Sequence, residues 1–286
     1  MNNRQAPQLA SIKGLIIDMD GVLWHGPDPL PGLARFFATL RRRGMRFVLA
    51  TNNNTMAPEG FVEKAKKFGV EVARGEIVTA SLATISYLKD HFDPGAPVYV
   101  IGEPPFKKMI AEAGYSLAGR DAVAVVAALD RSLTYEMLKT ATLLIRAGAA
   151  FIGPNPDACY PAPEGMIPGS GAVLSALATS TGRQPTIIGK PEKWVFQSAL
   201  KQMGITSRQA ASLGDRLDTD ILGGKRAGMN TILVLSGVTT AADLAASKIQ
   251  PTWVFSGIDE LARSLEGVSE SGGGEQPAAG FQVNRG

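Results

Sequence analysis

Short apolar runs alternate with longer amphipathic stretches along most of this chain. An apolar run at 14–17 precedes a stretch at 32–43 whose apolar residues recur every three or four positions, and a second run follows at 46–50. Apolar runs bounded by turn residues favour strands, whereas the three-to-four spacing favours helices. This alternation is typical of an α/β fold with mostly parallel strands.

The same pattern continues to about residue 255. Further strands are predicted at 77–79, 98–101, 123–129, 149–152, 186–188, 210–213, 231–235 and 253–255. Further helices are predicted at 58–68, 134–147, 172–180 and 192–203. Residues 267–286 are rich in Gly, Ser, Pro and Gln, which predicts a flexible tail.

Residues able to carry chemistry gather where the predicted strands end. They are Asp18 and Asp20, the turn 51–53, Lys190, and Asp215 with Asp218 and Asp220. Ligands of open parallel sheets bind at the carboxyl ends of the strands. We therefore expect four separate segments of the chain to meet at one edge of one sheet.

Several carboxylates, one lysine and a hydroxyl–amide turn suit a phosphoryl group beside a divalent cation. Clustered carboxylates repel and raise one another's pKa values, and a bound cation relieves that repulsion. Oxygen ligands alone suit Mg²⁺, which binds through one or two carboxylates with phosphate and water. Lys190 would neutralise charge on the phosphoryl oxygens, and Thr51 with backbone amides would hydrogen-bond them.

The first two aspartates fit two different steps of phosphate-ester chemistry. Carboxylates can attack phosphorus and form acyl phosphates, a role that we assign to Asp18. Asp20 lies two residues further on, past a turn. It could protonate the leaving oxygen and afterwards take a proton from the hydrolytic water.

Other classes of site are disfavoured by what the sequence lacks. The stretch 18–21 has its glycine fourth, which is too early for a calcium-binding helical loop, and no P-loop motif occurs. Two histidines without an HExxH motif argue against a zinc site. The single cysteine, Cys159, excludes an intramolecular disulfide, and we interpret it as a small buried residue.

Charge and hydropathy limit the partners. A total of 29 Lys and Arg against 26 Asp and Glu gives a net charge of +3, with no basic stripe, so no nucleic-acid partner is expected. No apolar run reaches the roughly 18 residues that suggest a membrane helix, so no membrane partner is expected. Residues 1–7 lack the apolar segment of a signal peptide, so we expect a cytoplasmic protein.

The motifs and their order resemble a known family. The order is D-x-D-G-V-L at 18–23, T-N-N at 51–53, G-K-P at 189–191 and G-D-R-L-D-T-D at 214–220. It resembles the haloacid dehalogenase-like phosphatase superfamily. More narrowly, it resembles the branch (subfamily IIA) that contains the NagD-type, para-nitrophenyl-phosphate, phosphoglycolate and pyridoxal-phosphate phosphatases. The resemblance spans about 12–262.

This resemblance implies a three-layer core with a Rossmann-like parallel sheet and an inserted α/β cap domain. The discontinuous core would comprise 1–78 and 184–266, the cap 79–183, and the tail 267–286. Caps of this branch often form dimer contacts. A homodimer through the cap is therefore one expectation.

The resemblance also implies roles for the aspartates. Asp18 would be the phosphoryl-accepting nucleophile and a Mg²⁺ ligand. Asp20 would be the acid/base and would offer its backbone carbonyl to Mg²⁺. Asp215 would be the third Mg²⁺ contact, supported by Asp220 from behind, although Asp218 is the alternative partner.

For substrate binding, the family pattern implies a second group of residues. Thr51, Asn52 and Asn53 would bind the phosphate, and Lys190 would orient it. Within the cap, Asp157 ends a turn in which proline replaces the threonine of the family pattern. We expect Asp157 to take part in substrate selection.

Together these features predict a Mg²⁺-dependent phosphomonoesterase that hydrolyses a small phosphorylated metabolite through an aspartyl-phosphate intermediate. One alternative is a phosphomutase or phosphotransferase of the same superfamily, which would pass the phosphoryl group to an acceptor other than water. Another is a non-catalytic protein that binds a phosphate ligand on the same scaffold. Substrates implied by the resemblance include phosphoglycolate, glycerol phosphate, pyridoxal phosphate and nucleoside monophosphates.

Overall fold

The computed structural model describes residues 9–162 and 164–267 of the 286-residue chain, which form two compact units. The first unit contains the described residues up to 50, then 62–77 and those from 199 onward. The second contains 51–61 and 78–198. Apart from its first residue, the tail predicted at 267–286 lies outside the described residues.

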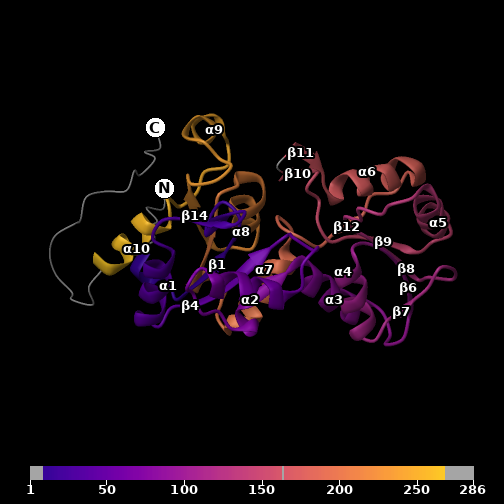
Figure 1. The fold of residues 1–286 in the computed structure, drawn as a ribbon, viewed down its shortest axis with the longest axis horizontal. Coiled ribbons are helices and arrows are strands. Elements are labelled where there is room, and N and C mark those ends of the chain that lie inside the picture. Colours follow the sequence, from indigo (N-terminus) through magenta and orange to yellow (C-terminus); the bar gives the residue numbers. More distant parts are fainter. Residues whose placement is uncertain (1–8, 163, 268–286) are drawn as a thin grey trace, which may run out of the picture. The chain divides into compact units, whose positions relative to one another are not determined.

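A six-stranded sheet forms the centre of the first unit (Figure 1). Its order is β15-β14-β13-β1-β4-β5, and the pairings from β15 through to β4 are parallel. The strands are β1 (Gly14–Ile17), β4 (Arg46–Thr51), β5 (Ile77–Thr79), β13 (Ala210–Gly214), β14 (Asn230–Val234) and β15 (Trp253–Phe255). A small hairpin, β2 (Trp24–His25) and β3 (Asp28–Pro29), follows β1.

In the part of the chain that the structure describes, four α-helices belong to this unit alone and two contribute residues to both units. The four are α1 (Leu33–Arg42), α8 (Leu222–Arg226), α9 (Ala241–Ala246) and α10 (Ile258–Gly267). The two shared helices are α2 (Pro58–Lys67) and α7 (Lys193–Met203).

Burial explains why the strands are unbroken apolar runs. Leu15, Ile16 and Ile17 of β1 are each at most 1% exposed, as expected for a parallel strand covered on both faces. From α1, the side chains of Phe36 and Leu40 are fully buried. Each such side chain contributes about 1.5–3 kcal/mol by leaving water.

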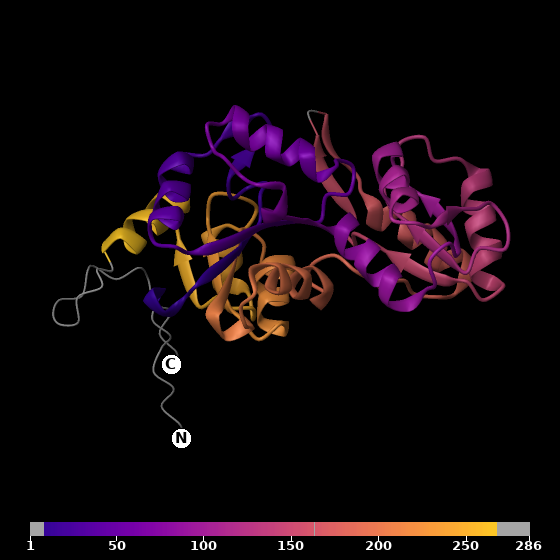
Figure 2. The ribbon, with the colours of Figure 1, turned by 90° about the horizontal axis from the view of Figure 1, so that it is seen from below.

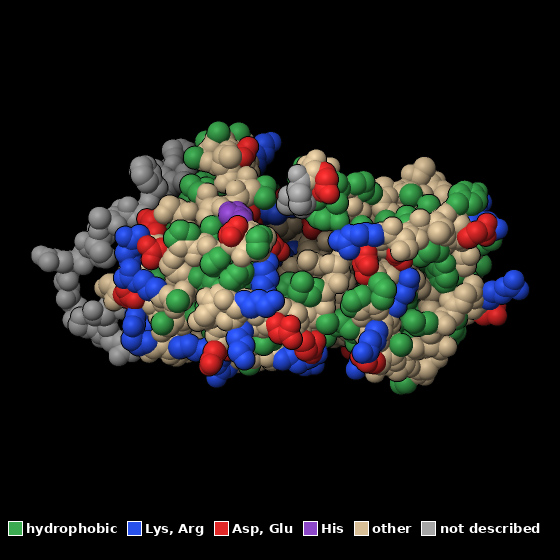
Figure 3. Space-filling model, viewed as in Figure 1, with side chains coloured by type: hydrophobic (Ala, Val, Ile, Leu, Met, Phe, Trp, Pro, Cys, Tyr) green, Lys and Arg blue, Asp and Glu red, His purple; other side chains and the backbone are tan. Residues whose placement is uncertain are grey.

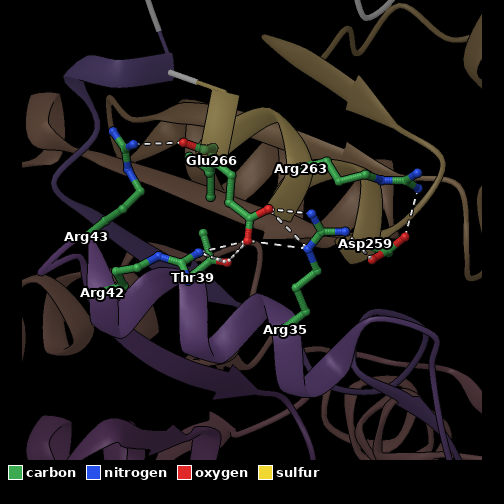
Figure 4. Close-up of polar contacts among 8 residues, drawn as sticks. Arg35, Thr39, Arg42, Arg43, Asp259, Arg263 and Glu266 are labelled. Atoms are coloured by element: carbon green, nitrogen blue, oxygen red, sulfur yellow. Dashed lines mark hydrogen bonds and ion pairs between the residues drawn. The ribbon is translucent and has the colours of Figure 1, made fainter. Parts of the chain in front are cut away.

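Helix α10, the last of this unit, packs against α1, the first. α10 lies alongside α1 (Figures 1 and 2), and polar contacts join them (Figure 4). Arg35 and Arg42 bind the carboxylate of Glu266, and the Thr39 hydroxyl donates to it at 2.7 Å. The bonds from Arg35 and Thr39 lower the pKa of Glu266 to about 2. Arg43 also donates to a backbone carbonyl of α10 (Figure 4). Lys and Arg side chains gather on the surface at this end of the unit (Figure 3).

The second unit contains a five-stranded parallel sheet in the order β12-β9-β8-β6-β7. Its strands are β6 (Pro97–Ile101), β7 (Ser116–Leu117), β8 (Ala124–Ala127), β9 (Ala150–Gly153) and β12 (Thr186–Ile187). Its helices are α3 (Ala80–His91), α4 (Pro104–Glu112), α5 (Tyr135–Arg146) and α6 (Ser170–Thr181). A hairpin, β10 (Cys159–Ala162) and β11 (Gly165–Pro168), completes the unit.

Parallel sheets flanked by helices confirm the α/β class. The predicted insertion at 79–183 lies wholly within the second unit, and its boundaries stay a prediction. The interpretation of Cys159 as buried was wrong. This residue is exposed because it begins a two-stranded hairpin that no third strand covers. Among the described residues, no helix combines the length and apolar character needed to cross a membrane.

Candidate active site

Three aspartates converge at the carboxyl edge of the first sheet. Asp18 follows β1, Asp215 follows β13, and Asp220 lies in the π-helical turn η4 (Leu217–Ile221). One carboxylate oxygen from each lies within 4.8 Å of the other two. Asp215 and Asp220 are each 1% exposed. Because buried carboxylates at this spacing repel, and because oxygen ligands suit a hard cation, the set fits a divalent metal ion.

Backbone closely surrounds Asp215. The backbone N–H of Val238 donates to Asp215 Oδ2 at 2.7 Å, and that of Thr239 donates to the Asp215 carbonyl at 3.1 Å. A Cβ atom on Gly21 or on Gly237 would collide with the Asp215 carboxylate. Gly21 also has a φ of 85°, which L side chains rarely adopt. Both glycines are therefore required by the position of this carboxylate.

The turn after β13 separates the roles of two nearby aspartates. Asp220 Oδ2 accepts from the backbone N–H of Arg216 at 3.2 Å, and its carbonyl accepts from Ser212 Oγ at 3.0 Å. Asp218 pairs with the Arg216 guanidinium at 3.1 and 3.2 Å, and its side chain is 67% exposed. The structure thus brings Asp220, and not Asp218, to the aspartates that follow β1 and β13.

Asp20 is held outside this acidic cluster. Its side chain is 55% exposed, and its Oδ1 accepts from Trp24 Nε1 at 3.0 Å. Lys64 Nζ lies 3.7 Å from the same oxygen. Burial lowers the pKa of Lys64, while the neighbouring Asp20 carboxylate opposes that effect.

The loop after β1 is anchored to the loop after β14. Ser236 Oγ donates to the carbonyl of Gly21 at 2.8 Å, and His25 Nε2 donates to the carbonyl of Ser236 at 2.8 Å. Trp24 is 1% exposed, and its ring centroid lies 5.6 Å from that of Phe68. The segment that carries the first two aspartates is therefore fixed by backbone and side-chain contacts.

In the second unit, Asn52 and Lys190 are buried side by side, although they belong to two separate segments of the chain. They are 7% and 4% exposed. The side-chain amide of Asn52 binds both the N–H and the carbonyl of Lys190. A Cβ on Gly189 would collide with that amide and with the carbonyl of Pro154. Asn52 therefore positions the backbone from which the lysine side chain projects.

The rest of the predicted phosphate-binding turn has a local hydrogen-bond pattern. Thr51 is 4% exposed, and its Oγ1 accepts from the backbone N–H of Asn53 at 3.0 Å. Asn53 Oδ1 accepts from both the N–H and the hydroxyl of Thr55 at 2.9 Å. These two side chains shape the turn that follows β4.

Asp157 lies between β9 and β10 in a tightly packed turn. Its N–H donates to Asn155 Oδ1 at 2.7 Å, and its carbonyl accepts from Gly171 N–H at 2.8 Å. A Cβ on Gly169 or Gly171 would collide with this turn. The packing fixes the backbone of Asp157, and its role in substrate selection stays a prediction.

The sequence reasoning missed a charged group at the carboxyl edge of the second sheet. Glu103 follows β6 and Arg131 follows β8. Arg131 Nη1 lies 3.0 Å from Glu103 Oε1, and its Nη2 donates to the Tyr160 hydroxyl at 3.3 Å. Asp130 is buried beside them, and Lys107 binds it at 2.9 Å. Burial acts to raise the pKa of Asp130, but bonds from Lys107 and from backbone N–H groups hold it below its ordinary value.

Comparisons with known proteins place this geometry in context. A model of the haloacid dehalogenase-like hydrolase family matches residues 15–116, and a model described as HAD-hydrolase-like matches 187–261. The acid sugar phosphatase of Staphylococcus aureus is 38% identical over 255 residues, which are 89% of this chain and 98% of that protein.

Several solved structures resemble this chain over most of its length. The 4-nitrophenylphosphatase of Thermotoga maritima has a TM-score of 0.85 and 35% identity over 89% of this chain and 98% of that one. NagD of E. coli has a TM-score of 0.82 and 32% identity over 87% and 98%. A glycerol phosphate phosphatase of Mycobacterium tuberculosis, solved with calcium, has a TM-score of 0.80 and 30% identity over 87% and 74%.

Proposed function

The chain belongs to the haloacid dehalogenase-like hydrolases and is a phosphatase, and on that premise we propose that it hydrolyses small organic phosphate monoesters with Mg²⁺. The observation that carries this proposal is the convergence of Asp18, Asp215 and Asp220 within 4.8 Å. Such a set is costly to bury without a cation, and it follows the strand ends where ligands of parallel sheets bind.

The acidic cluster fits the ion by its donor chemistry. Asp18 and Asp215 would hold Mg²⁺ through carboxylate oxygens, and Asp20 would add its backbone carbonyl. Asp220 either joins them directly or supports Asp215. The ion would neutralise these carboxylates and the bound phosphate. All-oxygen coordination favours Mg²⁺ over softer metals.

In the proposed first half-reaction, an Asp18 carboxylate oxygen attacks phosphorus in line with the leaving alcohol. The bond from phosphorus to the leaving oxygen breaks as the aspartyl-phosphate forms. Asp20 gives its proton to the leaving oxygen, so the product departs as a neutral alcohol.

In the second half-reaction, Asp20 acts as a base. It takes a proton from a water molecule whose oxygen attacks phosphorus, and inorganic phosphate departs as Asp18 is regenerated. Lys190 would supply positive charge to the phosphoryl oxygens throughout. Thr51, Asn52 and Asn53 would contribute backbone and side-chain donors, with Asn52 acting through the placement of Lys190.

For the substrate, we propose phosphate esters of sugars and small polyols. The support is that one relative is named an acid sugar phosphatase and another structure is that of a glycerol phosphate phosphatase. Asp157 and the Arg131 group lie on the second unit, near the carboxyl ends of its strands, where side chains could contact hydroxyl or carboxylate groups.

The test is hydrolysis of para-nitrophenyl phosphate with Mg²⁺, with EDTA, and by the Asp18→Asn variant. We expect turnover that requires both the ion and Asp18. Because the hydrolytic water attacks phosphorus, a single turnover in ¹⁸O-labelled water should place one labelled oxygen in the inorganic phosphate and none on the Asp18 carboxylate, as mass spectrometry of the phosphate and of the peptide containing Asp18 would show.

Two outcomes would overturn the proposal. Full activity in Asp18→Asn would exclude Asp18 as the nucleophile. Transfer of the phosphoryl group to an added sugar phosphate in preference to water would favour a phosphomutase. A panel of sugar and polyol phosphates then ranks substrates by kcat/KM.

A further inference from the structure

We infer that Trp24 and Lys64 are positioning residues that hold Asp20 by its Oδ1 atom and so present Oδ2 for proton transfer to the leaving group. This inference rests on the proposed function, in which Asp20 is the acid. It assigns a task to a buried indole and a helix lysine that the reaction scheme above leaves unused.

The first contact is a hydrogen bond within one turn of chain. Trp24 Nε1 donates to Asp20 Oδ1 at 3.0 Å, and the two residues also form an isolated β-bridge. The backbone N–H of Gly21 donates to the Trp24 carbonyl at 2.9 Å, which closes the turn. Because the indole is 1% exposed and packs on Phe68, its N–H is a fixed donor.

The second contact comes from α2. Lys64 Nζ lies 3.7 Å from Asp20 Oδ1 and 4.6 Å from the centroid of the Trp24 ring. The ammonium thus touches the carboxylate and the aromatic face that positions it. Its side chain is 23% exposed, so the pair is partly shielded from water and screened less than a surface pair.

Both contacts use the same oxygen of Asp20. Within the part of the chain that the structure describes, Oδ2 accepts no hydrogen bond. A side chain that is 55% exposed would otherwise rotate freely between its rotamers. Fixing Oδ1 therefore selects the orientation in which Oδ2 is available, and proton transfer requires such alignment.

The chemistry of the leaving group makes this role measurable. An ester of a poor leaving group needs a proton as the bond to phosphorus breaks, whereas para-nitrophenolate departs readily without one. Loss of Asp20 alignment should therefore slow phenyl phosphate far more than para-nitrophenyl phosphate. The two esters have nearly the same shape, so binding is matched between them.

The experiment measures kcat and KM for both esters in Lys64→Met and Trp24→Phe. General acid catalysis contributes about 10²–10⁴-fold. Because hydrolysis of the aspartyl-phosphate is common to both esters, kcat/KM reports the first half-reaction alone. Partial loss of alignment should therefore lower kcat/KM for phenyl phosphate by at least about 10-fold more than kcat/KM for para-nitrophenyl phosphate. KM should change less than kcat, and Lys64→Arg should recover most of the lost rate. Lys66→Met is the matched control, because Lys66 is exposed on the same helix.

Different outcomes test the positioning role of Trp24 and Lys64 and the proposed function on which it rests. Equal losses on both esters, or a Lys64→Met variant that behaves like Lys66→Met, would overturn the positioning role. Asp20→Asn should show the same preference for the better leaving group, and its absence would remove Asp20 as the acid. Retained activity in Asp18→Asn would instead overturn the proposed function. Trp24 is buried, so Lys64, which is partly exposed, provides the variant that tests the inference if Trp24→Phe fails to fold.

Discussion

Asn52 and Lys190 hold each other through two hydrogen bonds, although 138 residues separate them in sequence. Asn52 Nδ2 donates to the carbonyl of Lys190 at 2.9 Å, and the N–H of Lys190 donates to Asn52 Oδ1 at 2.7 Å. One amide thus satisfies both polar groups of a buried backbone. The placement of the lysine depends on a side chain contributed by a distant turn.

Asn52→Ala should therefore affect both stability and turnover. It removes the two hydrogen bonds that Asn52 makes to the buried backbone of Lys190, and each such loss costs about 1–3 kcal/mol. Urea denaturation measures the stability, and the KM for para-nitrophenyl phosphate measures phosphate binding. We expect a lower midpoint and a raised KM. Thr55→Ala, in the same turn, is the control, and an equal effect there would show that Asn52 has no special relation to Lys190.

The acidic cluster predicts unequal effects of substitutions at Asp220 and Asp218, which lie two residues apart in the same turn. Asp220→Asn should raise the Mg²⁺ concentration for half-maximal activity by about 10–100-fold, as loss of a supporting ligand does in other metal sites. Asp218→Asn breaks an exposed pair with Arg216 and should change it little. Titration of activity with Mg²⁺ measures this concentration in both variants. Equal increases in the two variants would contradict the placement of Asp220, and not Asp218, in the acidic cluster.

A glycine beside the cluster provides an independent test. Gly237→Ala would force a methyl group into the Asp215 carboxylate. Such overpacking lowers the free energy of unfolding by about 1–3 kcal/mol. The displaced carboxylate should also bind Mg²⁺ more weakly. Gly257→Ala is the control, because a Cβ there meets only ordinary contacts. Thermal melting with and without Mg²⁺ should show a smaller stabilisation by the ion in Gly237→Ala.

The contact between α1 and α10 predicts a dependence of stability on pH. Glu266 has a pKa of about 2 in the folded protein, against an ordinary value of 4.5. Its contribution is therefore complete above pH 4.5 and is lost as the pH falls from 4.5 towards 2. Glu266→Gln should melt below the parent protein at pH 7, and the difference should narrow as the pH approaches 2. A constant difference across that range would contradict the assignment. Glu112→Gln is the control, because the Glu112 side chain is exposed on α4.

All strands of the two sheets except β7 could be predicted, because burial on two faces leaves unbroken apolar runs such as Leu15–Ile17. Both residues of β7, Ser116 and Leu117, are exposed, so no apolar run marks this strand. The helix α3 could not. Its buried face is made largely of small or polar residues, Ala80, Ser81, Ala83 and Thr84, so no apolar stripe marks it. The hairpin of β10 and β11 was missed because those of its side chains that the structure describes are all exposed or half-buried, so the two strands show no alternation of apolar and polar positions.

Some residues of the candidate site could likewise be predicted from the sequence, and others could not. Asp18 and Asp215 could be predicted because each directly follows an apolar strand. Lys64 could not be distinguished from Lys66 and Lys67, since all three occupy one amphipathic helix. Only the packing of that helix against the loop after β1 singles out one of them.

The position of β1 between β13 and β4 determines how much of the chain must be synthesised before the first sheet can form. Gly14 of β1 pairs with Arg46 on one side and with Ala210 on the other. A nascent chain can form the first pairing early, but the second must wait until residue 210 has left the ribosome. Until then β1 is an apolar edge strand with unpaired backbone groups, which invites association with other chains. The acidic cluster is equally incomplete, so the emerging protein can neither bind its metal ion nor cleave a phosphate ester before most of its length has been made.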